Sequence, residues 1–419
     1  MSSGFRILLL STIQASLAAV MYAHTDVGRI VGIVQDSSGG VVQGATVIAK
    51  NEKTGTEQRV ESDSKGYYIL TQLQPSDYTV TGSSAGLVSS EFTGLVLQVG
   101  QERTVNLVLR PTSQKSEVTV SAGELAQLDT SSATVGINIS PREVEQLPMN
   151  GRQVSQLYLL APGAVNNGSG NFDNIRFSGR SNQENEIRFD GVEGTSVVDA
   201  SPGNLNGETS SGFRLQQSLE NVQEFQVASS NYPAEFGTGT GGQISFVTKS
   251  GTNEFHGSAF EYLRNDSLDA RNFFDKATKS KLRLNQFGGS LGGAIIKNKL
   301  FFFGGYEGLR QRTGAPIVET TLSAAARARA VPSIQPLLGA FPIGQAPTAD
   351  PNFDVITTTG AGILNEDSGS IRFDYNISDR FRIYARYFRD QGDASQVQNS
   401  TGSIYAQTAV PQNGVLSFN

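Results

Sequence analysis

The feature that most restricts the fold is a two-residue alternation of apolar and polar side chains near the C-terminus. Over residues 368–378 the apolar Ile371, Phe373, Tyr375 and Ile377 alternate with Arg372, Asp374 and Asn376, and over residues 381–390 the apolar Phe381, Ile383, Ala385 and Tyr387 stand against Arg382 and Arg386. Successive side chains of a β-strand point to opposite sides. A strand with one oily side and one polar side is typical of a barrel wall, with lipid outside and water inside.

Five amphipathic strands of this kind are predicted beyond Gly251, over residues 255–264, 284–295, 300–309, 368–378 and 381–390. Their connections alternate between long (265–283 and 310–367) and short (296–299 and 378–380). Outer-membrane barrels place short turns on one side and long loops outside, whereas a soluble sandwich explains the alternation but less easily the unequal loops. Because bacterial single-chain barrels need at least about 8 strands, the chain is a fragment of a longer barrel protein, a truncated gene product, or not a membrane protein at all, and we expect one of the first two.

Composition supports an all-β chain and excludes several classes of function. The 46 glycines, 14 prolines, 23 phenylalanines and 12 tyrosines favour tight turns between aromatic-rich strands. A net charge of -6 leaves no basic surface for a nucleic acid. The absence of cysteine rules out disulfides, thiolate metal sites and cysteine nucleophiles, and it makes export through an oxidising compartment chemically safe.

The N-terminal quarter is predicted to hold an export signal and a β-sandwich. Residues 1–23 have a charged start and an apolar run, as a signal peptide does, and no later run of 18 apolar residues indicates a transmembrane helix. Residues 26–111 contain seven short β-like segments between turn signals, which fits a small sandwich. The segments are 29–34, 44–50, 57–61, 67–71, 78–81, 92–99 and 104–109.

The sandwich resembles the carboxypeptidase regulatory-like domain, which is transthyretin-like. The resemblance is carried by Gly32-Ile-Val-Gln-Asp36, Gly44-Ala-Thr-Val47, Gly66-Tyr-Tyr68, Leu73-Gln-Pro75 and Tyr78-Thr-Val80. The chain departs from the family at Ser76, where a glycine usually follows the proline. The resemblance implies a non-catalytic module, and some relatives have a carbohydrate-binding-like fold.

A linker over residues 112–139 follows, and it contains one isolated extended segment, Glu117, Val118, Thr119, Val120, Ser121 and Ala122. Such a strand can be captured by the free edge of another protein's sheet, where main-chain hydrogen bonds supply affinity. The segment resembles a TonB box, the stretch gripped by a TonB-type energy-transducing protein. The alternative is a last strand of the sandwich.

Residues 140–250 begin with a helix start, Ser140-Pro-Arg-Glu143, and continue with an ordered series of motifs. The series includes Leu147-Pro-Met-Asn-Gly-Arg152, Arg176-Phe-Ser-Gly-Arg180, Ile187-Arg-Phe-Asp-Gly-Val192 and Gly241-Gly-Gln-Ile-Ser-Phe-Val-Thr-Lys-Ser-Gly251. It resembles the plug domain of TonB-dependent receptors, in particular the Oar-like type. The structural candidates in this plug are Arg176, Gly179, Arg180, Asp190 and Gly191. In the family, plug arginines pair with acids on the barrel wall.

Residues 251–419 are predicted to be the start of the transmembrane β-barrel, and Phe287-Gly-Gly-Ser-Leu-Gly-Gly293 again resembles the Oar-like type. The predicted fold is therefore mainly β: a transthyretin-like sandwich, a mixed α+β plug and the first strands of an incomplete outer-membrane barrel. Two short motifs match patterns known from enzymes but lack the structural context that those enzymes need. Gly82-Ser-Ser-Ala-Gly86 lacks the helix and base of a hydrolase, and Gly237-Thr-Gly-Thr-Gly-Gly242 precedes a β-run rather than a helix. We predict no catalytic, cofactor or metal-binding residue.

The resemblance implies the N-terminal portion of an outer-membrane receptor whose sandwich lies in the periplasm. Its expected partners are a TonB-type energy-transducing protein, outer-membrane lipid and an unknown ligand: a siderophore, glycan, peptide or protein. The alternative is a secreted or surface-attached adhesion protein built of β-domains, with glycan contact through the sandwich.

Overall fold

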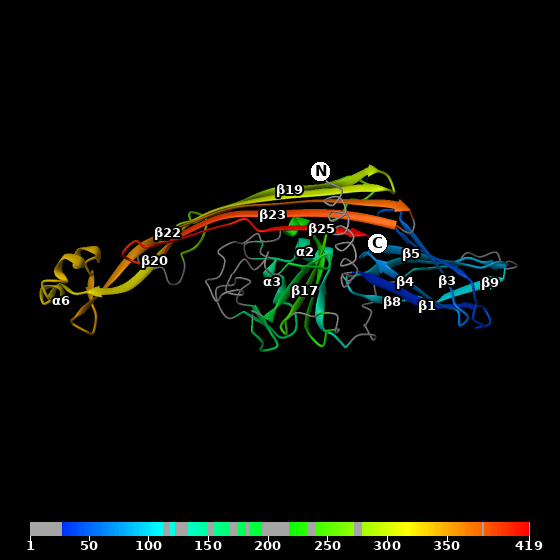
Figure 1. The fold of residues 1–419 in the computed structure, drawn as a ribbon, viewed down its shortest axis with the longest axis horizontal. Helices are drawn as coiled ribbons and strands as arrows, with labels where there is room; N and C mark the ends of the chain where they lie inside the picture. Colours follow the sequence, from blue (N-terminus) through cyan, green and yellow to red (C-terminus); the bar gives the residue numbers. More distant parts are fainter. Residues whose placement is uncertain are drawn as a thin grey trace, which may run out of the picture.

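The computed structural model describes residues 27–418 apart from 112–117, 122–132, 150–151, 153, 167–174, 182–183, 195–217, 233–235, 237–238, 272–278 and 379–380. The predicted signal peptide, residues 1–23, lies outside the described residues. Three units follow one another along the chain: a sandwich, a middle unit that we call the plug, and a long curved sheet that we call the wall (Figure 1).

The sandwich packs two five-stranded sheets on one core. One sheet has the order β4-β1-β9-β6, with β8 paired to β1, and consists of β1 (Gly28–Asp36), β4 (Tyr67–Leu73), β6 (Leu87–Val88), β8 (Glu102–Thr104) and β9 (Leu107–Pro111). The other has the order β10-β7-β5-β2-β3 and consists of β2 (Thr46–Asn51), β3 (Glu57–Glu61), β5 (Ser76–Ser83), β7 (Ser90–Leu97) and β10 (Val118–Ser121). Alternate residues such as Tyr68 and Leu70 are buried between the sheets, as the period of two requires.

The plug has a central sheet in the order β11-β16-β17-β14-β15, covered by two short helices. The strands are β11 (Val135–Ile139), β14 (Glu186–Phe189), β15 (Val192–Glu193), β16 (Val222–Ser230) and β17 (Gln243–Thr248), with the two-stranded ribbon of β12 (Ala164–Asn166) and β13 (Ile175–Phe177) beside them. The two short helices are α2 (Pro141–Gln146) and α3 (Ser155–Tyr158), and a 3-10 helix, η4 (Leu219–Asn221), precedes β16.

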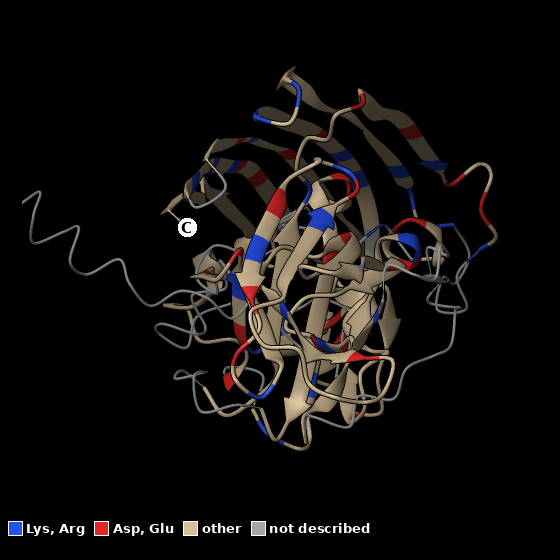
Figure 2. Ribbon diagram, turned by 90° about the vertical axis from the view of Figure 1, so that its right-hand side faces the viewer, with Lys and Arg blue, Asp and Glu red and all other residues tan. Residues whose placement is uncertain are grey.

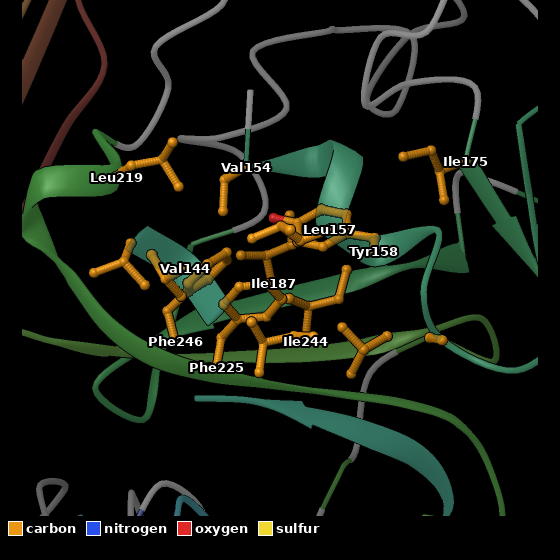
Figure 3. Close-up of a cluster of buried hydrophobic side chains, with 14 of the residues drawn as sticks. Val144, Val154, Leu157, Tyr158, Ile175, Ile187, Leu219, Phe225, Ile244 and Phe246 are labelled. Atoms are coloured by element: carbon orange, nitrogen blue, oxygen red, sulfur yellow. The ribbon is translucent and has the colours of Figure 1, made fainter. Parts of the chain in front are cut away.

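The sequence explains why the plug folds as a unit. Ser140 and Glu143 form a capping box with Pro141 at the first turn of α2, as the sequence predicts. On the sheet beneath, Phe246 packs against Phe225 with ring centroids 4.9 Å apart (Figure 3). Phe189 stacks on Phe246 with ring centroids 5.1 Å apart. These rings and the aliphatic side chains around them are buried, so the plug has a core of its own.

The wall is a sheet of eight strands in the order β18-β19-β20-β22-β23-β24, with β21 paired to β22 and β25 paired to β23. Its strands are β18 (His256–Asn265), β19 (Leu282–Ile296), β20 (Leu300–Leu322), β21 (Ala346–Pro347), β22 (Phe353–Ser378), β23 (Phe381–Val397), β24 (Ile404–Ala409) and β25 (Gln412–Phe418). The sheet is curved but not closed, and the plug lies on its concave side (Figures 1 and 2).

The sided pattern of the wall agrees with the sequence. On β22, the side chains of Ile371 and Phe373 are 45% and 40% exposed, whereas Arg372 between them is 4% exposed. The apolar side therefore faces away from the plug, and the charged side faces it. The wall also has buried aromatic side chains, Phe301, Phe303 and Phe388, but the predicted apolar rows are exposed, with Tyr375 43% and Tyr387 46% exposed.

Two expectations about the wall are wrong. About half of the expected loop 310–367 is strand, because β20 continues to Leu322 and β22 begins at Phe353. The two strands form a long ribbon that ends in α6 (Ala324–Ala328) and the 3-10 helix η5 (Gln335–Ala340). The last predicted strand, 381–390, does not end at Asp390 but continues as β23 to Val397, and two further strands, β24 and β25, follow it. In both places main-chain pairing extends a strand beyond the apolar alternation that predicts it.

The three units have a defined direction. The short connection between β19 and β20, the end of β22 and the start of β23 lie at the end of the wall where the sandwich sits, and the long ribbon with α6 lies at the opposite end (Figure 1). The sandwich therefore lies at the short-turn end, which is the periplasmic end of outer-membrane barrels.

Candidate functional site at the interface of plug and wall

One plug carboxylate, that of Asp190, is carried on a two-residue turn. Phe189 on β14 pairs with Val192 on β15, so that only Asp190 and Gly191 connect the strands. Their φ angles are +50° and +79°, as a tight hairpin turn with two positive φ angles needs. Asp-Gly suits such a turn because aspartate tolerates the left-handed conformation better than most residues. The turn places the Asp190 side chain against the wall.

Asp190 binds two arginines of the wall at once. Its Oδ1 lies 3.3 Å from Nη1 of Arg372, and its Oδ2 lies 2.7 Å from Nε of Arg386. Thr248 of β17 donates its backbone N–H at 2.9 Å and its hydroxyl at 2.8 Å to the same carboxylate. Burial alone would raise the pKa of Asp190, but the two guanidinium groups and the Thr248 hydrogen bonds outweigh it, so the pKa is lowered.

Both arginines are fixed by further contacts on the wall. Arg372 pairs with Asp374 at 2.8 Å, and its guanidinium lies 4.5 Å from the ring centroid of Tyr384. Arg386 donates to Oδ1 of Asn413 at 2.9 Å. Because Arg372 and Arg386 face each other across β22 and β23, the register of the sheet brings both charges to one point. We call Asp190, Thr248, Arg372 and Arg386 the first latch.

A second latch lies on the other side of the plug, around Arg152. Its Nη2 is 2.9 Å from Glu220 of the plug, its Nε is 4.0 Å from Glu307 of β20, and its guanidinium lies 4.5 Å from the ring centroid of Phe260 and 4.6 Å from that of Tyr262 on β18. Arg152 also has a φ of +54°, a conformation that non-glycine residues rarely adopt. Backbone strain of this kind concentrates at functional sites.

Glu307 and a neighbouring glycine complete the second latch. The Glu307 carboxylate is almost fully buried and accepts hydrogen bonds from Gln286 at 2.5 Å and from the hydroxyl of Ser218. Two residues away, a Cβ on Gly305 would lie only 2.0 Å from Oδ1 of Asn221. The glycine therefore leaves a notch in the wall that receives the Asn221 side chain from the plug. Arg152, Glu220, Ser218, Asn221, Gly305 and Glu307 form the second latch.

Of the predicted plug residues, two lie at the interface with the wall, and the structure shows the other three in contacts or turns of the plug itself. Asp190 and Gly191 make the first latch. Arg176 lies on β13 opposite Val165, and Arg180 donates to the carbonyl of Thr240 within the plug, while Gly179 has a φ of +76° in the turn between them. A wall partner for Arg176 and Arg180 stays a prediction. In the described part of the chain, the plug arginine that meets a wall acid is Arg152, which the sequence shows only as the end of a motif.

The predicted TonB box lies at the edge of the sandwich. Val118, Thr119, Val120 and Ser121 form β10, which pairs in parallel with β7 from Ser90 to Thr93, and Glu117 and Ala122 lie outside the described residues. This is the arrangement of the alternative interpretation, a last strand of the sandwich. In the described chain β10 is the last strand of this sheet, so its outer side has no neighbouring strand. The TonB box therefore stays a prediction.

Searches of the described residues for two other kinds of site gave nothing. No cluster of three or more His, Cys, Asp or Glu side chains there is arranged to hold a metal ion. Nor does a helix in that part of the chain have the length and apolar character needed to cross a membrane.

Comparisons with known proteins identify two domains. Residues 29–110 match the carboxypeptidase regulatory-like domain, and residues 247–352 match an outer membrane beta barrel domain. The TonB-dependent transporter Oar of Myxococcus xanthus is 29% identical over 313 residues, which are 70% of this chain and 28% of the transporter. The chain therefore spans less than a third of the length of this relative.

Two solved structures show more distant similarity. The TIE protein of Bacillus anthracis is 22% identical and covers 20% of this chain and 17% of its own, with a TM-score of 0.18. Catechol 1,2-dioxygenase from Pseudomonas arvilla is 11% identical and covers 26% of this chain and 68% of its own, also with a TM-score of 0.18. Neither similarity bears on function.

The sided wall and the domain matches define the class: the chain combines a carboxypeptidase regulatory-like sandwich with strands of an outer membrane beta barrel domain. Within that class it is similar to a TonB-dependent transporter of the Oar type. The predicted fold class, resemblance and outer-membrane location are thereby confirmed.

Proposed function

We propose that the chain is the N-terminal part of a ligand-uptake receptor in which the two latches hold the plug against the wall until a pull releases it. The observation that carries the proposal is the position of Asp190, a plug carboxylate bound to two wall arginines. A buried ion pair fixes position more than it adds stability, because its desolvation cost offsets most of the attraction. When the plug moves away from the wall, water solvates the carboxylate and the guanidinium groups. Such a contact can therefore open and form again.

The pull is proposed to act on residues 117–122 through a TonB-type energy-transducing protein. In the described chain β10 is the last strand of its sheet, so a strand of a partner can add to its outer side by main-chain hydrogen bonds. The position of the sandwich at the short-turn end supports a periplasmic location for this segment, where such a partner would reach it.

The ligand is proposed to be a siderophore, glycan, peptide or protein, bound at the outer loops and the adjacent end of the plug. The relative is a transporter, and we propose transport without any chemical step for this chain.

A binding assay tests the role of the segment. The full-length receptor in detergent is presented to the periplasmic domain of a TonB-type protein, and we expect Val118→Pro to weaken binding at least tenfold, because proline removes an N–H that the added strand needs. The matched control, Ser113→Pro in the linker before the segment, is expected to bind as the unaltered receptor does. Equal binding by Val118→Pro would sink the assignment.

A further inference from the structure

The sandwich is seated on the plug through β16. Gln223 donates its side-chain amide to the carbonyl of Pro75 at 2.8 Å, and the backbone N–H of Val99 donates to the carboxylate of the next residue, Glu224. Asn138 of β11 lies 3.4 Å from the side chain of Gln98, beside Val99. One turn of the sandwich, residues 98–101, therefore lies directly on the plug sheet.

The sandwich is also seated on the short-turn end of the wall. The contacts between the two units are Asn253 N–H to the Lys53 carbonyl at 3.1 Å, Asn376 amide to the Thr56 hydroxyl at 3.0 Å, and Arg382 guanidinium to the Glu57 carbonyl at 3.4 Å. A small pocket lined by both polar and apolar side chains, among them Asn51, Phe301, Ile383 and Arg382, lies between them. Domains of one chain are expected to move relative to each other unless their interface is large and hydrophobic. Figure 2 looks onto this end and shows the sandwich in front of the concave side of the wall.

Glu224 is the one acidic side chain of β16 in this seat, and its environment is unfavourable for charge. The side chain is only 4% exposed, and no cation pairs with it directly in the described structure. The charged groups that act on it are Lys53 and Asp77 of the sandwich, which pair with each other at 3.2 Å. Burial raises the pKa of Glu224 to about 7, against the opposing effects of the Val99 N–H and of Lys53.

We propose that the seat of the sandwich on the plug and wall is a reversible docking interface, and that Glu224 makes its strength depend on pH. Protonated Glu224 favours the docked sandwich, and ionised Glu224 favours release. This proposal shares one assumption with the proposed function, namely that the short-turn end of the wall faces the periplasm.

The direction follows from linkage. In the undocked receptor Glu224 is exposed to water and has the ordinary pKa of a glutamate, about 4.3, so docking raises its pKa and takes up a proton. Docking is therefore strongest at low pH and weakens as the pH rises toward 7. Above that pH the carboxylate is ionised in both states, and no further loss is expected.

Distances between spin labels test the proposal in the full-length receptor in liposomes. Lys65 of the sandwich and Lys297 of the short turn are exposed, lie outside the seat and are replaced by cysteines to carry the labels; this chain has no cysteine of its own. We expect one short distance at pH 5 and a second, longer population at pH 8, with the ratio of released to docked receptor rising at least tenfold.

Two variants test whether the pH dependence of docking comes from Glu224 or from another acidic residue. Glu224→Gln keeps the size and the acceptor for Val99 but has no charge, so we expect the docked distance at both pH values. Glu61→Gln on the exposed side of β3 is the matched control and is expected to behave as the unaltered receptor does. A single docked distance at pH 8 in the unaltered receptor, or release of Glu224→Gln at pH 8, overturns the proposal. No TonB-type protein is present, so failure here and failure of the binding assay are distinguishable.

Discussion

At the scale of single residues, Asp190 combines two requirements that few side chains meet together. The turn needs a residue that tolerates a φ of +50°, and the wall needs an anion between two guanidinium groups. Glycine and asparagine satisfy the first requirement but not the second, and glutamate satisfies the second but not the first. Aspartate is thus the residue type that meets both requirements at position 190.

Asp190→Asn is expected to weaken the hold of the plug by about 3–5 kcal/mol, because it leaves two buried arginines without their shared anion while it preserves the turn. Urea denaturation of the full-length receptor, followed by protease cleavage in the plug, measures the loss. Glu145→Gln, which removes an exposed ion pair with Lys249, is the control and should change stability by less than about 1 kcal/mol. A loss no larger than that of the control would contradict the first latch.

Two adjacent glycines on β20 provide a matched pair of substitutions. Gly305→Ala places a methyl group 2.0 Å from the Asn221 side chain, whereas the nearest atom to a Cβ on Gly304 is 3.7 Å away. We expect Gly305→Ala to destabilise the seated plug by about 1–3 kcal/mol, as overpacking does, and Gly304→Ala to have little effect. Equal stability of the two variants in the same protease assay would show that the notch is not needed.

The sequence alone predicts only part of this site. The motif around Ile187 to Val192 draws attention to Asp190, because Asp-Gly between two apolar runs predicts a hairpin turn. Its partners cannot be predicted, since Arg372 and Arg386 lie far along the chain and meet Asp190 only through the register of β22 and β23. The role of Arg152 is hidden for the same reason, because Glu307 reaches it across the interface.

At the scale of elements, the β20–β22 ribbon is divided into a membrane part and an outer part. The outward side of β20 is apolar or small from Leu300 to Gly308, and then carries Arg310 and Arg312, the first of which pairs with Asp367 at 2.8 Å. Tyr306 beside this pair has its hydroxyl on Asp367, as interfacial tyrosines do. The lipid band therefore ends near Arg310.

Phe373→Lys, within this band, is expected to cost about 2–4 kcal/mol, because it exposes an ammonium group to hydrocarbon. The same change at Val318, which is 51% exposed on the ribbon beyond Arg310, is expected to be neutral. The amount of heat-modifiable, folded receptor in outer membranes is the readout. Normal assembly of Phe373→Lys would argue that this side of β22 does not face lipid.

Sequence patterns predict the elements of the wall well inside the membrane and poorly outside it. Within the band, lipid on one side and plug on the other impose alternation, and the predicted segments 368–378 and 381–390 lie within β22 and β23. Beyond the band both sides of a ribbon meet water, so residues 310–322 lack the alternation of apolar and polar side chains. The remaining strand signal there is the β-branched residues Ile317, Val318, Thr320 and Thr321, which favour the extended conformation that main-chain pairing completes.

At the scale of the whole molecule, two contacts that hold the units together, those of Asp190 and of Glu224, respond to acid in opposite directions. The lowered pKa of Asp190 means that the first latch contributes its full stability above the ordinary aspartate pKa of about 3.9 and loses it as the pH falls through the lower folded value. The raised pKa of Glu224 means that the sandwich seat is stronger at pH 5 than at pH 8.

We therefore expect the stability difference between the unaltered receptor and Asp190→Asn to stay constant from pH 8 to about 4 and to shrink below that. Thermal unfolding across this range measures it. A difference that changes between pH 8 and pH 5 would mean that another group, not Asp190, controls the latch.

The ribbon formed by β20 and β22 also determines how far from the cell the chain reaches. The thirteen residues from Arg310 to Leu322, at about 3.3 Å each, give the ribbon a length of roughly 40 Å beyond the lipid band. A bulky particle or antibody that never touches the lipid can meet α6 and η5 first. Within the described chain this tip lies at the end opposite to the sandwich, away from everything that a periplasmic partner would contact.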